Sequence, residues 1–147
     1  MYYFHTDRGR AALTENRRDI CRFIWSLWSP TGQLSEETWA ATATSFDHPD
    51  FVEIVLHSYR HRFGGVPGDP TYDKIEARLA TRPKVKVPSI VLQGRDDGVG
   101  PPQDEDVDRL QFTSFYERWI VDVAGHNLPK EAPEAFAAAV LTLPNLE

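Results

Sequence analysis

Cysteine is nearly absent from the sequence, and long apolar runs are absent too. Each of these features excludes certain classes of protein. Cys21 is the only cysteine among 147 residues, so an intrachain disulfide and a multi-cysteine metal site are excluded. No apolar run approaches the ~20 residues that a membrane-spanning helix needs. The N-terminus lacks the basic and apolar regions of a signal peptide. We therefore expect a cytoplasmic protein with no membrane partner.

Positive charge is also scarce. The 16 lysines and arginines are outnumbered by 22 aspartates and glutamates, which gives a formal net charge of -6. A protein that grips the phosphate backbone needs the opposite balance. The local arginine clusters are interleaved with acids, as is typical of solvated helix faces. We expect no nucleic-acid partner.

The first half of the chain has the pattern of helices. Apolar residues recur near the 3.6-residue period over residues 7–28, and Pro30 predicts the end of that helix. Ser35 is a candidate helix cap, Gly64 and Gly65 are typical of a helix C-terminus, and Asp69 followed by Pro70 predicts another helix start.

The second half has a different pattern. The stretches "VKVPSIVLQG" and "YERWIVDVAG" predict two strands, while "DEDVDRLQF" and "APEAFAAAVLTL" predict a helix after each. This strand-helix-strand-helix order predicts a parallel strand pair packed by helices. The chain thus divides into a helical region, 1–82, and a βαβα segment, 83–147.

Two strands are few for a parallel sheet. Parallel strands normally lie buried among neighbours, and the apolar run from Ile90 to Leu92 needs cover on both faces. The missing sheet is either supplied by another chain or lost from this one. We therefore expect a complementing chain or self-association.

Candidate catalytic groups follow both predicted strands. Asp96 and Asp97 come after the first strand and His126 after the second, and ligands in open α/β sheets gather beyond such carboxyl ends. A carboxylate there could hold the tautomer of the imidazole, whose other nitrogen would act as a general base. The alternatives are that the Asp-Asp-Gly run only forms a turn and that the loop histidine is structural or faces solvent.

Two motifs resemble the C-terminal part of the α/β-hydrolase superfamily. In that family the acid follows a strand like "VPSIVLQGRDD", and the base lies in a loop like "AGHNLPKEAPE". The resemblance implies an α/β fold in which a helical cap is followed by two parallel strands with helices. It implies Asp97 as the acid, three residues after Gly94, and His126 as the base.

The helical region resembles the cap of epoxide-hydrolase-like members. The stretches "YYFHTDRGRAAL" and "HSYRHRF" carry this resemblance. Such caps use tyrosines to hold and protonate the epoxide oxygen, which implies this role for Tyr59 in the Tyr59-Arg60 pair. The alternative is that Tyr59 only fills the apolar face of its helix.

The family's nucleophile has no counterpart in these residues. No G-x-S-x-G motif occurs, and the formal G-x-D-x-G match from Gly94 to Gly98 is followed by "VGPPQ" instead of the helix that a nucleophile elbow needs. A complementing chain, a truncated gene and a longer parent are the possibilities that this leaves open.

Other constellations are weaker. His57 and His61 have the i, i+4 spacing of helical zinc ligands, but no third ligand accompanies them, so we expect neither a metal nor a cofactor. The favoured function is hydrolysis of an epoxide or related small apolar substrate. The alternatives are an ester or carbon-halogen hydrolase of the same superfamily and an inactive remnant that acts as an interaction module.

Overall fold

The chain folds into two compact units. The structure is a computed structural model that describes residues 2–30 and 35–143. One unit comprises Met1–Ile24 and Leu34–Ala80, and the other comprises Trp25–Gln33 and Thr81–Glu147. The division expected from the sequence, at 82/83, differs from this partition in residues 25–33 and in residues 81 and 82. Within the first of these segments, Trp28 accepts hydrogen bonds from residues of the candidate site described below.

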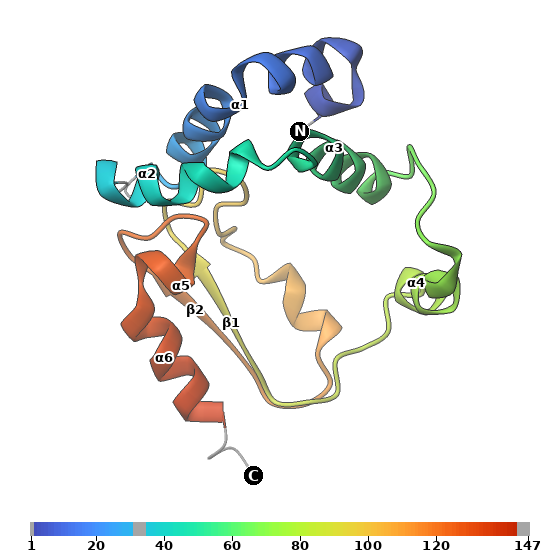
Figure 1. Ribbon diagram of the computed structural model, residues 1–147. Coiled ribbons are helices and arrows are strands. Elements are labelled where there is room, and N and C mark those ends of the chain that lie inside the picture. The colour runs from blue at the N-terminus through green and yellow to red at the C-terminus, as the bar shows by residue number, and fades with distance from the viewer. Residues whose placement is uncertain (1, 31–34, 144–147) are drawn as a thin grey trace. The chain divides into compact units, whose positions relative to one another are not determined.

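The N-terminal unit is helical, as the sequence predicts (Figure 1). Its helices begin and end at the expected signals. The Ser35 hydroxyl accepts the amide of Thr38 at 3.1 Å, and the Asp69 carboxylate accepts the amide of Thr71 at 2.9 Å. Gly64 follows the helix end with a φ of 73°. The elements are η1 (Tyr2–His5), α1 (Asp7–Trp28), α2 (Glu36–Ala43), η2 (Thr44–Asp47), α3 (Phe51–Arg62), η3 (Pro70–Tyr72) and α4 (Asp73–Ala80). The last residues of α1, from Trp25 onward, belong to the other unit.

This unit has an apolar core of its own. Phe4, Leu13, Val52 and Leu56 are buried together, from η1, α1 and α3. Partly buried neighbours, among them Tyr59, pack against this cluster. Burial of large apolar side chains is the dominant stabilising contribution in a small unit of this kind.

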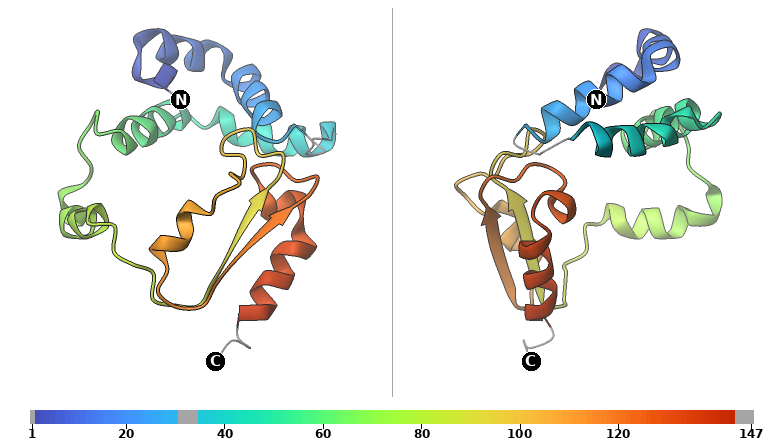
Figure 2. Two further views of the ribbon diagram at one scale, coloured as in Figure 1. Left: turned by 180° about the vertical axis from the view of Figure 1, so that it is seen from behind. Right: turned by 60° about the vertical axis from the view of Figure 1, so that its left-hand side comes forward.

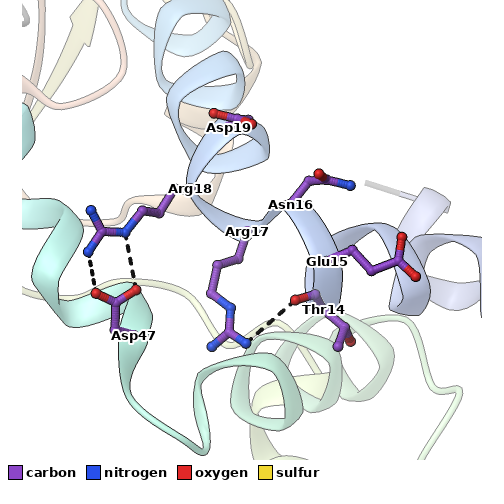
Figure 3. A pocket seen from close by; sticks show the side chains of 7 residues that line it. All are labelled: Thr14, Glu15, Asn16, Arg17, Arg18, Asp19 and Asp47. Atoms are coloured by element: carbon purple, nitrogen blue, oxygen red, sulfur yellow. Dashed lines mark hydrogen bonds and ion pairs between the residues drawn. The ribbon is translucent and has the colours of Figure 1, made fainter.

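Helix α1 bends at Asn16, whose φ of -129° and ψ of 36° are not helical. The continuous helix expected from the periodicity is therefore wrong at this point. An asparagine side chain competes with the backbone hydrogen bonds of a helix, which favours such a break. Beside the bend, Arg17 donates to the carbonyl of Thr14 at 3.5 Å and Arg18 pairs with Asp47, around a shallow surface hollow (Figure 3).

The C-terminal unit contains a parallel pair of strands, as predicted. Strand β1 (Ser89–Gly94) pairs with β2 (Tyr116–Val121) in a register that runs from Ser89 opposite Tyr116 to Gly94 opposite Val121. Among the described residues this sheet has two strands. Helix α5 (Leu128–Glu131) and α6 (Pro133–Thr142) follow β2. Figures 1 and 2 show α6 along one face of the strands and the β1–β2 connection on the other.

The short helix expected between the strands is present. It is a 3-10 helix, η4 (Val107–Gln111), and not the α-helix that a regular βαβα unit would have. The Asp106 carboxylate holds η4 in place by accepting the amide of Arg109 at 3.3 Å and the hydroxyl of Tyr116 at 2.9 Å. Burial, followed by this hydrogen bond to Asp106, raises the pKa of Tyr116 to about 12. Side-chain anchoring thus replaces a regular crossover helix.

Within residues 2–30 and 35–143, no helix combines the length and the apolar character needed to cross a membrane.

Candidate active site

Asp97 lies in the tight turn that follows β1. Its amide donates to the carbonyl of Gly94 at 3.2 Å, and its carboxylate oxygen Oδ1 accepts the amides of Val99 at 2.7 Å and Gly100 at 3.2 Å. The side chain retains 14% of its accessible surface. The Asp-Asp-Gly run therefore does form a turn, and that turn fixes the Asp97 carboxylate.

His126 lies in the loop that follows β2 and meets Asp97. Its Nδ1 is 3.1 Å from Oδ1 and 3.0 Å from Oδ2 of the Asp97 carboxylate. The side chain of His126 is 43% exposed. The carboxyl ends of two adjacent parallel strands thus bring together the acid and the imidazole that the sequence singled out.

The charge of Asp97 determines which ring nitrogen of His126 carries a proton. Burial of Asp97 opposes its ionisation, but the hydrogen bonds from His126, Val99 and Gly100 outweigh this and lower its pKa below the ordinary value. An ionised carboxylate only accepts hydrogen bonds, so Nδ1 of His126 carries the proton and donates it. The remaining ring nitrogen, Nε2, is then free of a proton and is the basic position of the neutral ring.

A third segment, at the end of α1, completes the site. The carbonyl of Trp28 accepts the amides of Gly98 at 3.2 Å and His126 at 3.1 Å. The Trp28 ring also contacts the His126 ring edge to face, with centroids 5.2 Å apart. The sequence reading missed Trp28, although the "WSP" helix end marks where this segment leaves α1. One carbonyl therefore ties the acid turn to the base loop.

Glycines allow these three segments to approach. A Cβ on Gly98 would lie 1.8 Å from the carbonyl oxygen of Leu27, and a Cβ on Gly125 would lie 2.7 Å from the Cα of Ser29. Any side chain at these two positions would force the backbones apart. The glycines of "DDG" and "AGH" are therefore required by close packing, a reason that turn propensity alone does not provide.

Tyr59 belongs to the N-terminal unit. It lies on α3 and packs against the apolar core, with its ring 5.2 Å from that of Phe4. Burial raises the pKa of Tyr59, against the opposing effect of Arg62. The phenol therefore stays protonated at neutral pH, and it also fills the apolar face, as the alternative interpretation expected.

His57 and His61 stack on α3 with ring centroids 5.9 Å apart. Across the described part of the chain, no group of three or more His, Cys, Asp or Glu side chains is arranged to hold a metal ion.

Comparison with known proteins places nearly the whole chain within one relative. The structure matches the crystal structure of a protein described as a putative epoxide hydrolase from Klebsiella pneumoniae subsp. pneumoniae MGH 78578, with a TM-score of 0.91 and 40% sequence identity. The match covers 99% of this chain and 48% of the Klebsiella protein. No family profile matches the chain, and no curated protein matches it. The chain thus spans about half the length of its structural relative.

Proposed function

The chain belongs to the α/β-hydrolase superfamily, as the cap and C-terminal part of an epoxide-hydrolase-like member, and from this premise we propose that it supplies the proton-handling part of a hydrolytic active site. The observation that carries the proposal is the Asp97–His126 pair, with Nδ1 within 3.1 Å of both carboxylate oxygens. In this arrangement Asp97 orients the ring and stabilises its protonated form.

His126 acts as the general base in the proposed reaction. Its Nε2 removes a proton from a water molecule as that water attacks the ester formed between enzyme and substrate. The ester bond breaks, the product leaves as an alcohol, and the proton on Nε2 passes to the departing oxygen. Asp97 remains ionised throughout and stabilises the imidazolium by its hydrogen bond from Nδ1.

The residue that forms the ester lies outside these 147 residues, which contain no G-x-S-x-G motif. Within the G-x-D-x-G match, Asp97 follows the central aspartate and is engaged with His126, and no helix follows directly. The nucleophile therefore comes from a longer parent polypeptide or from a complementing chain.

The proposed substrate class is a small apolar epoxide. When an epoxide ring opens, negative charge develops on its oxygen, and a protonated phenol stabilises that oxygen by donating a hydrogen bond. Tyr59 is suited to this role because burial raises its pKa, so it remains a donor at neutral pH. The resemblance of the helical region to epoxide-hydrolase caps supports the same assignment.

A hybrid protein tests the proposal. This chain replaces the matched 48% of the Klebsiella protein, and hydrolysis is measured on a small epoxide, an aryl ester and a haloalkane. We expect epoxide hydrolysis that falls by about 10²–10⁴-fold with His126→Ala, as for loss of a general base. The matched control is Asp96→Asn, which alters the neighbouring carboxylate and should retain most of the activity.

The unaltered Klebsiella protein is assayed on the same three substrates. If the hybrid protein hydrolysed the ester or the haloalkane but not the epoxide, the epoxide assignment would be overturned. Full activity of the His126→Ala hybrid would overturn the base assignment.

A further inference from the structure

The carboxylate of Glu131 holds the loop that carries His126. Oε2 accepts the amide of Gly125 at 2.7 Å, and Oε1 accepts the amide of Asn127 at 2.8 Å. Oε1 also accepts the hydroxyl of Ser29 at 2.7 Å. One side chain thus binds the residues immediately before and after His126 and ties them to the segment that follows α1.

The surroundings of these hydrogen bonds favour a strong interaction. Ser29 is 4% exposed, and a Cβ on Gly125 would lie 2.9 Å from Oε2, so the carboxylate fits directly against the loop backbone. Hydrogen bonds to an ionised acceptor are shorter and stronger than bonds between neutral groups. The bonds from Ser29 and Gly125 are partly buried, which reduces competition from water and strengthens them.

Helix α5 explains how Glu131 reaches the loop. The helix begins directly after Asn127, and the amide of Glu131 donates to the carbonyl of Asn127 at 2.9 Å. This single turn directs the Glu131 side chain back over the helix N-terminus. Side chains on a helix lean toward its N-terminus, which is the direction needed here.

We propose that Glu131 is a positioning residue that fixes the His126 loop so that Nδ1 faces the Asp97 carboxylate. The backbone of His126 is held by Glu131 through both neighbours and by the Trp28 carbonyl through its own amide, at 3.1 Å. A hydrogen bond of 3.0–3.1 Å at Nδ1 weakens steeply if the ring moves or tilts. The catalytic importance of Glu131 rests on the proposed function, whereas its geometric effect does not.

The test uses the 147-residue chain with Glu131→Gln, which keeps the size of the side chain but replaces one acceptor oxygen by a donor. Two properties are measured by NMR: the exchange rates of the Gly125 and Asn127 amide protons, and the downfield Nδ1–H signal of His126. We expect amide exchange to accelerate on the order of tenfold and the Nδ1–H signal to be lost. Glu134→Gln, an exposed carboxylate on α6, is the matched control and should change neither property.

A second variant and a readout in the hybrid protein complete the test. If Glu131→Gln does not fold, Ser29→Ala removes one of the three hydrogen bonds and should weaken the Nδ1–H signal in the same direction. Faster amide exchange with an unchanged Nδ1–H signal would reduce Glu131 to a structural helix residue, and no change in either would contradict the proposal outright. In the hybrid, Glu131→Gln should lower kcat and leave KM unchanged. If Asp97→Asn leaves the hybrid fully active, the proposed function fails while the geometric result for Glu131 still stands.

Discussion

Different interactions stabilise the interior of each of the two units. In the N-terminal unit, large side chains are buried together, with Leu13 and Leu56 each 1% exposed. In the described part of the C-terminal unit, the buried residues are small, namely Ser29, Gly94, Ala124, Gly125 and Ala139. The first unit is therefore stabilised mainly by apolar packing, and the second mainly by close backbone approach and hydrogen bonds around its site. Substitutions that test packing and substitutions that test backbone approach should act on different units.

The largest effect is expected from the apolar core. Leu56→Ala should lower the free energy of unfolding of the N-terminal unit by about 2–5 kcal/mol, because it leaves a cavity among fully buried neighbours. Ile54→Ala on the same helix, at a side chain that is 62% exposed, should cost less than about 0.5 kcal/mol. Chemical denaturation followed by circular dichroism measures both. Equal costs would show that this unit is not built on the core described above.

The next largest effect tests whether Gly98 is needed because two backbone segments pass close together there or only because glycine is flexible. Gly98→Ala should destabilise the C-terminal unit by about 1–3 kcal/mol, because its Cβ would lie 1.8 Å from the carbonyl oxygen of Leu27. Gly100→Ala should be nearly neutral, since a Cβ there meets nothing within 4 Å. The Nδ1–H signal of His126 should be lost only in the first variant. If both variants behave alike, close packing does not explain the glycine of the acid turn.

The pH dependence of stability should report on Asp97. Its folded-state pKa is lowered, so its contribution is fully present above the unfolded value, about 3.9, and is lost as the pH falls through the lower folded value. Each unit by which the pKa is lowered corresponds to about 1.4 kcal/mol. Denaturation of wild type and Asp97→Asn from pH 7 to pH 3 should give a stability difference that is constant above about pH 5 and shrinks below about pH 4. A difference that grows on acidification would contradict the sign of this shift.

The smallest effect should be shared by both units. Arg10 pairs with Glu53 in one unit and Arg95 pairs with Asp122 in the other, and all four side chains are at least 40% exposed. Double-mutant cycles should give only a small coupling for each pair, and this coupling should decrease with added salt. A large coupling for Arg95 and Asp122 alone would show that this exposed pair, which joins the two strand ends, stabilises the C-terminal unit more than a surface ion pair normally does.

Local signals in the sequence predicted much of the fold. The caps at Ser35 and Asp69, the end of α1 before Pro30 and the parallel strand pair all follow from short-range preferences, and the structure confirms them. The short helix expected between the strands is present, but as a 3-10 helix that side-chain hydrogen bonds to Asp106 stabilise, a helix type that the sequence pattern did not specify. The bend at Asn16 could not be predicted either, because the helical spacing of apolar residues continues on both sides of it.

The site was only partly readable from the sequence. Asp97 and His126 could be paired because both follow predicted parallel strands, so their proximity requires only the sheet. Ser29 and Glu131 could not be paired in this way, because 102 residues separate them and neither periodicity nor a turn signal reports such a contact. Hydrogen bonds between distant segments depend on the packed structure, and the positioning residues of the site are of this kind.

The titration of the Asp97 carboxyl group tests the central claim most directly. NMR of its side-chain carboxyl carbon across the acidic pH range gives the pKa in the intact chain. We predict a pKa below the ordinary value of about 3.9, and a higher value in His126→Ala, since the imidazole hydrogen bond is one cause of the lowering. A pKa at or above the ordinary value in wild type, unaffected by removal of the imidazole, would show that the two groups do not form a proton-handling pair.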